Sequence, residues 1–294
     1  MEKNKISRLA RAKINLDLLI TGRREGGYHI LDSLVVFADY GDEISVRPSP
    51  DLGHELSLGI TGPFAAELIG LKDNIILKAA RKLQKKFNIL DGAQITLVKN
   101  LPVSSGIGGG SADAAAAIHA LMELWQISDK KPGLDELLLS LGADVPVCFA
   151  SKTTQMTGVG EGLDPITIDF PLYLCMVNPG TPVATAEIFK ARAMRDRVFS
   201  NPRKLSKAIA SPRELLEILS ASGNDLEPDA CAIEPAINTV IDQIRARNEC
   251  LFAGMSGSGA TCFGLFLSND AARSAVGNIQ YAFPHWWVKA ACVP

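Results

Sequence analysis

Apolar and polar residues alternate in several stretches of the first hundred positions, a pattern typical of half-buried β-strands. The alternating or β-branched stretches predict strands over Ile14–Ile20, Leu34–Val46, Glu55–Thr61 and Ala93–Lys99. Between the last two, apolar residues recur three and four positions apart, which predicts an amphipathic helix that runs to about Phe87. Asp73 or Asn74 precedes this helix as a predicted N-cap.

Alanine dominates the next segment, and this composition predicts a helix over Ser111–Trp125 with Ser111 as its N-cap. A short helix over Leu134–Leu141 is expected to stop at Gly142, and Asp144 follows directly.

Beyond about residue 160 the elements become shorter and lose any regular order. The expected strands are Tyr173–Val177, Phe263–Leu267 and Trp287–Val293, and the expected helices are Ala184–Met194, Pro212–Ala221, Cys231–Arg247 and Asp270–Ile279. Strands and helices are mixed without regular βαβ alternation, which favours the α+β class. We expect two domains, residues 1–160 and 161–294.

Composition narrows the class of protein. Apolar residues make up 47% and charged residues 21% of the 294 positions, as in ordinary globular proteins. The formal net charge of -2 gives no general attraction to nucleic acid or an acidic membrane, so any phosphate binding must be local. The six cysteines form no C-x-x-C pair and no zinc spacing, which indicates reduced thiols. With no secretory signal and no apolar stretch long enough to span a bilayer, we expect a cytoplasmic protein without nucleic-acid or membrane partners.

A glycine-rich loop separates the predicted strand Ala93–Lys99 from the alanine-rich helix. Glycine lets a ligand approach the backbone closely, and the following helix offers free N–H groups and the positive end of its dipole. Such a site suits a phosphate. The residues expected to hold it are Pro102, Ser104, Ser105, Gly106, Gly108, Gly109, Gly110 and Ser111.

Two common nucleotide motifs fit this loop poorly. A P-loop needs a lysine after the glycines, and none follows here. A dinucleotide fingerprint counted from Gly106 needs glycine at the position of Ser111. The remaining alternative is a flexible turn before a helix.

Three stretches together resemble the motifs of the GHMP kinases: Ala12–Leu16, the glycine loop Pro102–Ser111, and Gly254–Thr261. They occur in the order and spacing of that family and extend over nearly the whole chain. The resemblance implies an N-terminal domain like domain 2 of ribosomal protein S5, a ferredoxin-like C-terminal domain, and an active site in the cleft between them. It also implies ATP as co-substrate.

Three further stretches, Thr21–His29, Phe37–Asp42 and Leu141–Pro146, resemble the members that act on 4-diphosphocytidyl-2-C-methyl-D-erythritol. The implied reaction transfers the γ-phosphoryl group of ATP to the 2-hydroxyl of that small molecule, in non-mevalonate isoprenoid synthesis. Two alternatives stay open, another GHMP small-molecule kinase and a catalytically inactive nucleotide-binding protein. We expect a monomer or a weak homodimer.

The resemblance assigns catalytic roles to Lys13 and Asp144. Lys13 would stabilise charge on the transferring phosphoryl group and hold Asp144, although a lone lysine on a strand is more often a surface residue. Asp144 would accept the proton of the substrate hydroxyl, and a helix N-cap is the other interpretation of this residue.

By resemblance, Tyr28 stacks on the cytosine ring, His29 contacts its polar edge and Phe189 is a second stacking partner. Core packing is the alternative for Phe189. Asn15 is expected to bind the methylerythritol hydroxyls. Mg²⁺ is expected because it bridges the β- and γ-phosphates of ATP, with Ser111 as a candidate ligand.

The loop departs from the common family pattern at Ser104 and Ser105, where Gly-Ala is frequent, and at Ala112 and Asp113. Arg11 also replaces a common proline. These departures put the geometry of the loop and the affinity for the nucleotide in question.

Overall fold

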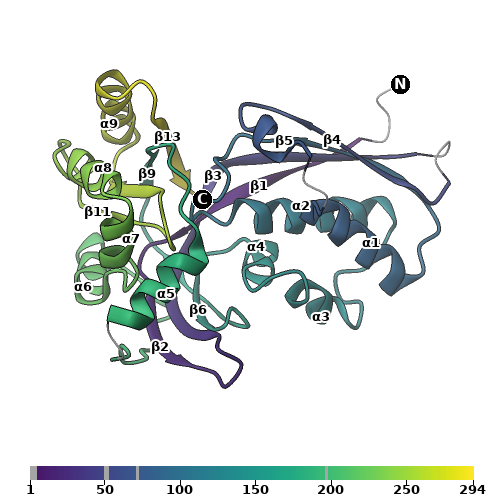
Figure 1. Ribbon diagram of the computed structural model, residues 1–294, viewed down its shortest axis with the longest axis horizontal. Helices are drawn as coiled ribbons and strands as arrows, with labels where there is room; N and C mark the ends of the chain where they lie inside the picture. The colour runs from purple at the N-terminus through teal and green to yellow at the C-terminus, as the bar shows by residue number, and fades with distance from the viewer. Residues whose placement is uncertain (1–4, 50–52, 71–72, 196–197) are drawn as a thin grey trace. The chain divides into compact units, whose positions relative to one another are not determined.

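The structure of the protein is a computed structural model that describes residues 5–49, 53–70, 73–195 and 198–294 (Figure 1). The chain forms two units, the first of residues 1–12, 40–103 and 108–150, the second of residues 13–39, 104–107 and 151–294. Strands β1 (Ile6–Asn15) and β3 (His29–Pro48) each contribute residues to both units.

Four strands contribute to the sheet of the first unit, because β1 pairs with β3 and residues 6–12 of β1 belong to this unit. The C-terminal half of β3 pairs antiparallel with β5 (Ala93–Val98), from Glu43 opposite Val98 to Pro48 opposite Ala93. The other edge of β5 pairs in parallel with β4 (Leu56–Thr61). β5 alternates buried and less buried residues, as its period of two requires.

Helices cover one face of these strands (Figure 1). They are α1 (Ile75–Phe87), α2 (Gly109–Leu124), α3 (Leu134–Leu139) and α4 (Val145–Ala150), with the 3-10 turn η2 (Ala65–Leu68) between β4 and α1. The predicted cap of α1 is confirmed for Asn74, whose side chain accepts the N–H of Ile76 at 2.8 Å. Helix α2 is buried along nearly its whole length, which explains its alanine-rich composition, because small side chains let neighbouring helices approach.

The second unit contains two main groups of strands. β2 (Leu19–Arg23), the N-terminal half of β3, β6 (Thr154–Gly158) and β7 (Gly162–Pro165) form an antiparallel array. A four-stranded antiparallel sheet has the order β11 (Phe252–Met255), β12 (Cys262–Phe266), β9 (Leu172–Asn178), β13 (Trp287–Val293). Two short strands, β8 (Thr167–Ile168) and β10 (Ala208–Ile209), pair in parallel.

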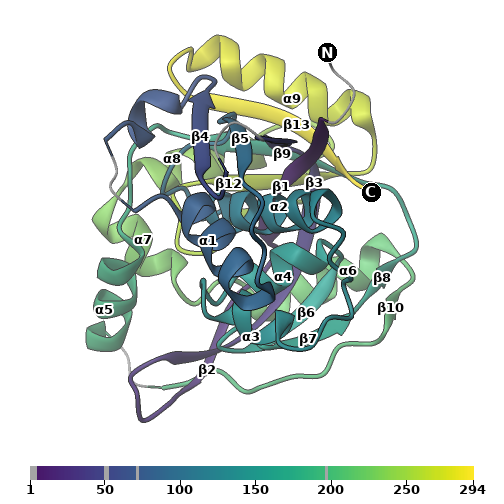
Figure 2. The same cartoon turned by 90° about the vertical axis from the view of Figure 1, so that its right-hand side faces the viewer.

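Helices α8 (Ala236–Arg245) and α9 (Asn269–Ala282) pack on the four-stranded sheet, and Figure 2 shows α9 beside β13. The other helices of this unit are α5 (Thr185–Arg195), α6 (Pro212–Ser222) and α7 (Glu227–Ile233). The apolar faces of α5, α7, α8 and α9 and the sheet enclose one core cluster that includes Val177, Ile188, Ile237 and Phe266. All six cysteines are free thiols. Among the described residues, no helix combines the length and apolar content that a membrane crossing requires.

Besides β3, which begins at His29 instead of Leu34, three predicted elements differ from the structure by a break or a shifted cap. The strand expected over Ile14–Ile20 is interrupted between β1 and β2, because buried Asp17 leaves the strand pattern and its carboxylate accepts the N–H of Leu34 at 2.7 Å. The single helix expected over Cys231–Arg247 is divided into α7 and α8 at Pro235, whose ring nitrogen has no N–H for a continuous helix. The third is α2, which begins two residues earlier than expected, as the next section describes.

Candidate active site

The glycine loop leads directly into helix α2. Gly108 adopts a left-handed φ of 65° and is the N-cap, and its carbonyl accepts the N–H of Ala112 at 2.8 Å. The prediction that Ser111 caps the helix is therefore wrong: Ser111 lies in the first turn, because glycine reaches the left-handed cap conformation that places the helix start earlier. The N–H groups of Gly109, Gly110 and Ser111 have no acceptor within the helix, so this turn can bind an anion.

The preceding part of the loop, residues 104–107, packs against the segment between β11 and β12. Ser256 Oγ donates to the carbonyl of Gly106 at 3.1 Å, and the N–H of Thr261 donates to the carbonyl of Ser105 at 3.1 Å. A Cβ on Gly106 would lie 2.5 Å from the carbonyl oxygen of Ser256. Gly106 is therefore required for backbone packing.

The remaining loop residues differ in exposure. Pro102 and Ser105 are buried, whereas Ser104 is exposed and adopts a left-handed φ of 52°. A Cβ on Gly109 would lie 3.2 Å from Lys99 Nζ, but one on Gly110 would meet no atom closer than 3.9 Å. Gly110 is exposed, and a Cβ there would make only an ordinary contact with Ile75, so this position beside the first turn of α2 is the least crowded of those compared.

Lys13 and Asn15 lie at the buried end of β1, with 4% and 1% of their surfaces exposed. The N–H of Lys13 donates to the carbonyl of Ile107 at 3.0 Å. Asn15 donates its N–H to Ser256 Oγ at 3.1 Å and its Nδ2 to Ser33 Oγ at 2.7 Å. Its Oδ1 has no hydrogen-bond partner among the described residues, so a buried acceptor is available to a ligand.

Asp144 immediately precedes α4 and is half-buried. Its carbonyl accepts the N–H of Cys148 at 3.1 Å, which places the residue at the N-cap position of that helix. The predicted contact between Lys13 and Asp144 stays a prediction.

The three predicted aromatic and imidazole residues belong to the second unit. Tyr28 lies in the turn between β2 and β3 with 71% of its surface exposed. The rings of His29 and Phe189 stack with centroids 4.8 Å apart and an angle of 25°. Burial, together with the charges of Arg23 and Arg192, lowers the pKa of His29, so the neutral imidazole is favoured. Phe189 is half-buried and also packs against the core of the second unit, so core packing, the alternative role given for this residue, applies in part.

Sequence reasoning missed a buried group of charges beside the glycine loop, here called the lysine cluster (Asp42, Lys99 and Asp113). Lys99 Nζ lies 2.5 Å from Asp42 Oδ2 and 2.8 Å from Asp113 Oδ2, and all three side chains are at most 4% exposed. Burial alone would lower the pKa of Lys99, but the charges of Asp113 and Asp42 raise it instead. A charged residue inside the run of alanines, Asp113, was the available signal.

A second buried group, the arginine cluster (Asp17, Asp32 and Arg203), was also missed. The guanidinium of Arg203 lies 2.6 Å from Asp17 Oδ2 and 3.3 Å from Asp32 Oδ1. Ser33 Oγ donates to the carbonyl of Asp17 at 2.6 Å and accepts from Asn15, so the cluster is linked to the candidate substrate residue. Arg203 lies in an irregular segment without hydrophobic period, and no local pattern marks it.

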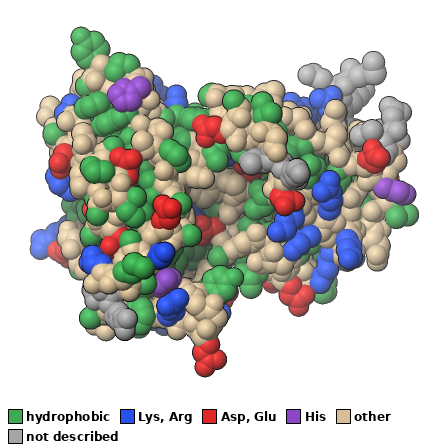
Figure 3. All heavy atoms as spheres, in the orientation of Figure 1, with side chains coloured by type: hydrophobic (Ala, Val, Ile, Leu, Met, Phe, Trp, Pro, Cys, Tyr) green, Lys and Arg blue, Asp and Glu red, His purple; other side chains and the backbone are tan. Residues whose placement is uncertain are grey.

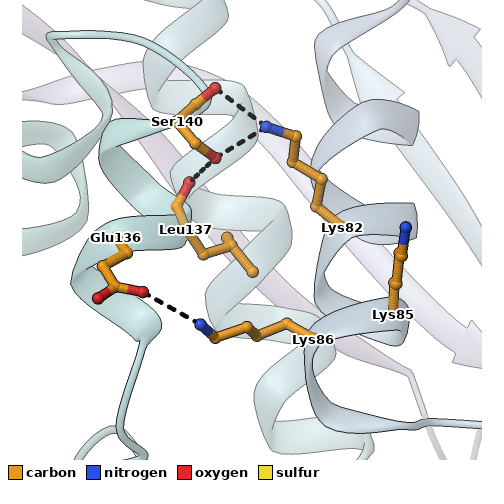
Figure 4. A pocket seen from close by; sticks show the side chains of 6 residues that line it. All are labelled: Lys82, Lys85, Lys86, Glu136, Leu137 and Ser140. Carbon is orange, nitrogen blue, oxygen red and sulfur yellow. Dashed lines mark hydrogen bonds and ion pairs between the residues drawn. The ribbon is translucent and has the colours of Figure 1, made fainter.

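A cavity of about 460 Å³ lies between α1 and α3, and none of the predicted site residues lines it (Figure 4). Lys82 Nζ donates to the carbonyl and the hydroxyl of Ser140, and Lys86 pairs with Glu136 at 3.2 Å. Figure 3 shows Lys and Arg side chains gathered over this side of the first unit. These contacts join the two helices and account for the polar lining.

The described residues contain no group of three or more His, Cys, Asp or Glu side chains that could hold a metal ion.

Comparison with known families identifies the two parts of the chain. The description "GHMP kinases N terminal domain" matches residues 74–153, and "GHMP kinases C terminal" matches residues 204–285. A relative from Cereibacter sphaeroides named 4-diphosphocytidyl-2-C-methyl-D-erythritol kinase is 49% identical over 96% of this chain and 97% of its own. The chain belongs to the GHMP kinases, and within them to the family of that relative. The α+β fold and the kinase family predicted from the sequence are confirmed.

Further relatives support this membership. A protein of the same name from Paramagnetospirillum magneticum is 46% identical over 96% of both chains. The crystal structure of a 4-(cytidine 5'-diphospho)-2C-methyl-D-erythritol kinase superposes on this GHMP kinase with a TM-score of 0.77 and 30% identity, covering 98% of this chain and 100% of the other. Homoserine kinase from Cytophaga hutchinsonii, with a TM-score of 0.68, 18% identity and coverage of 100% and 96%, shares the fold. ATP is the co-substrate that this kinase family implies.

Proposed function

We propose that this GHMP kinase transfers the γ-phosphoryl group of ATP to the 2-hydroxyl of 4-diphosphocytidyl-2-C-methyl-D-erythritol, a step of non-mevalonate isoprenoid synthesis. The near full-length identity of 49% to a relative of that name carries this proposal. In the reaction the 2-hydroxyl oxygen bonds to the γ-phosphorus, the bond to the ADP oxygen breaks, and the hydroxyl proton leaves to a base.

The nucleotide side of the proposed site is the first turn of α2. Its N–H groups and the positive end of its dipole suit the phosphates, and exposed Gly110, which has no Cβ, lets them approach the backbone. Pro102, Ser104 and Ser105 precede this turn and shape the path of the backbone. Gly106 acts indirectly, because its packing against Ser256 holds the loop.

Lys13 and Asp144 are the proposed catalytic residues. Phosphoryl transfer depends mainly on positioning and on neutralising charge, which the ammonium of Lys13 would supply. Asp144 would accept the hydroxyl proton as the general base. Asp144 lies directly before α4, at its N-cap position.

The acceptor side is proposed to use Asn15, Tyr28, His29 and Phe189. The unpartnered Oδ1 of Asn15 can accept a hydrogen bond from a substrate hydroxyl, which would remove the cost of a buried unsatisfied oxygen. Exposed Tyr28 offers a ring face to the cytosine. Neutral His29 has one nitrogen that donates and one that accepts, and its stacking on Phe189 would fix the ring that contacts the polar edge of the base.

The finer features stay proposals. Mg²⁺ is proposed as the ion that accompanies ATP and would neutralise charge on its phosphates, and Ser111 is the residue proposed to help hold it. The domain boundary near residue 160, the cytoplasmic location and a monomer or weak homodimer are retained from the sequence.

A substrate panel tests the proposed function. The native chain is incubated with ATP and either 4-diphosphocytidyl-2-C-methyl-D-erythritol, galactose, homoserine or mevalonate, and ADP release is measured. We expect turnover with the first compound and at least about 100-fold less with the others, since the pocket must pair polar groups of the cytosine. Faster turnover with another acceptor would indicate a different GHMP kinase, and ATP binding without any ADP release would indicate an inactive nucleotide-binding protein.

A further inference from the structure

The lysine cluster joins three segments of the first unit at one ammonium group. Asp42 comes from β3, Lys99 directly follows β5, and Asp113 is the fifth residue of α2. Lys99 Nζ donates to Asp42 Oδ2 at 2.5 Å and to Asp113 Oδ2 at 2.8 Å. Burying three ionisable groups is costly unless each has close partners, so these contacts constrain the three segments strongly.

The cluster also holds the chain on both sides of the glycine loop. Asp42 Oδ1 accepts the N–H groups of Asn100 at 2.6 Å and Leu101 at 2.8 Å, which fixes the backbone as it leaves β5. On the far side of the loop, Lys99 Nζ lies beneath Gly109, where an added Cβ would be 3.2 Å away. Asp113 is one turn further along the same helix.

We propose that Asp42, Lys99 and Asp113 are positioning residues that hold the leading and trailing ends of the glycine loop and thereby set the affinity for the phosphates of ATP. This inference rests on the proposed function, because it takes the first turn of α2 as the phosphate site. A small displacement of that turn would misdirect its N–H groups, and the dipole effect is confined to the first turn.

The hydrogen bond between Lys99 and Asp113 can be tested separately from the charge of Asp113. Asp113 Oδ2 accepts from Lys99, whereas its Oδ1 has no partner among the described residues and is buried. An asparagine can present its oxygen to Lys99 in the same way, but an alanine cannot. Lys99 keeps its pairing with Asp42 in either variant, so no charge is left alone.

The test measures ATP binding by calorimetry without any second substrate, at a temperature where every variant is folded. Asp113→Ala should weaken binding roughly 10- to 100-fold, since misplacement of a binding group by about 1 Å has effects of that order. Asp113→Asn should retain more of the affinity than Asp113→Ala. The control is Ile118→Ala, which removes a fully buried side chain from the same helix and should lower stability with affinity within about threefold.

Native affinity in folded Asp113→Ala, or an equal loss in Ile118→Ala, would overturn the inference, because the cluster would then only stabilise the helix. Failure of the proposed function gives a different result. A native chain that binds ATP but phosphorylates none of the four acceptors refutes the substrate and leaves the binding comparison decisive. A native chain that does not bind ATP refutes both.

Discussion

The two buried clusters have the same composition, two aspartates and one basic side chain, but their polar atoms are satisfied differently. In the arginine cluster each carboxylate oxygen has a partner. Asp17 Oδ1 accepts from the backbone N–H of Leu34 and from the guanidinium of Arg203, and Asp17 Oδ2 contacts the hydroxyl of Ser222 and the same guanidinium. Asp32 Oδ1 accepts from the side chains of Gln155 and Arg203. Asp32 Oδ2 accepts from the backbone N–H of Arg203. In the lysine cluster, Asp113 Oδ1 is left without one among the described residues.

The difference follows from the two cations. The planar guanidinium of Arg203 offers five donors and serves two carboxylates at several atoms, whereas the ammonium of Lys99 has three donors. The arginine cluster, in which every carboxylate oxygen has a partner, is called saturated here and is expected to hold its segments in place. The lysine cluster is called unsaturated, and it contains Asp113, whose protonation can change. Burial raises the pKa of Asp113 to about 8, with the attraction of Lys99 opposing and the charge of Asp42 adding to the shift.

The largest expected effect is the loss of stability when the arginine cluster is broken. Arg203→Met leaves Asp17 and Asp32 buried without their cation and should lower the free energy of unfolding by roughly 3–5 kcal/mol. Chemical denaturation measures the loss. The control Arg213→Met removes an exposed pair with Glu217 and should change stability by about 0.5 kcal/mol or less. Equal losses in the two variants would show that the arginine cluster is not a support.

The second prediction concerns Asp144, which lies outside both clusters, and it distinguishes an effect on catalysis from an effect on stability. Asp144→Asn should fold normally and lower kcat by at least about 100-fold, because an amide cannot take the hydroxyl proton. Steady-state ADP release measures kcat, and Asp135→Asn, which changes an exposed residue of helix α3, serves as the control. A kcat that barely changes in Asp144→Asn would exclude it as the base.

The third prediction concerns Asp113 of the lysine cluster and the change of folding stability with pH. The pKa of Asp113 is about 8 in the folded chain, against 3.8 as its ordinary value, so the folded chain binds a proton that the unfolded chain has released between these limits. This contribution to stability is fully present below about pH 4 and is lost as pH rises toward 8.

Asp113→Asn cannot titrate, so its stability relative to the native chain should rise by about 1–2 kcal/mol between pH 6 and 7.5. Urea unfolding of both chains at each pH gives the difference, in which the other titrating groups cancel. A difference that is constant with pH would mean that Asp113 is ionised in the folded state as it is in the unfolded one.

The smallest expected effect concerns the acceptor side. Tyr28→Ala should raise KM for the cytidylyl substrate about tenfold and leave KM for ATP nearly unchanged, because stacking on a base contributes about 1–3 kcal/mol. Tyr281→Ala, which removes another exposed tyrosine, is the matched control. Equal rises of both KM values in Tyr28→Ala would argue against stacking and for a general disturbance.

Much of the local structure could be predicted from the sequence. The span and cap of α1, the strand β5 and the loop–helix junction follow from hydrophobic period, Asn74 and glycine content, which act over a few residues. The division of α7 from α8 was also available, because Pro235 stands in the middle of the apolar pattern. The interruption at Asp17 was not, since it depends on a hydrogen bond to Leu34 from another strand.

In the glycine loop, some properties follow from the local sequence and others depend on tertiary packing. Its composition and its position before a helix determined that the chain presents backbone N–H groups for a phosphate, because those properties are local. Tertiary packing decided that Gly106 serves the contact with Ser256 while Gly110 is exposed and makes only an ordinary contact with Ile75. It also decided that Lys99 pairs with Asp42, 57 residues earlier, and with Asp113. Such choices arise from steric fit and from the desolvation of charges by residues distant in sequence, which leave no periodic signal along the chain.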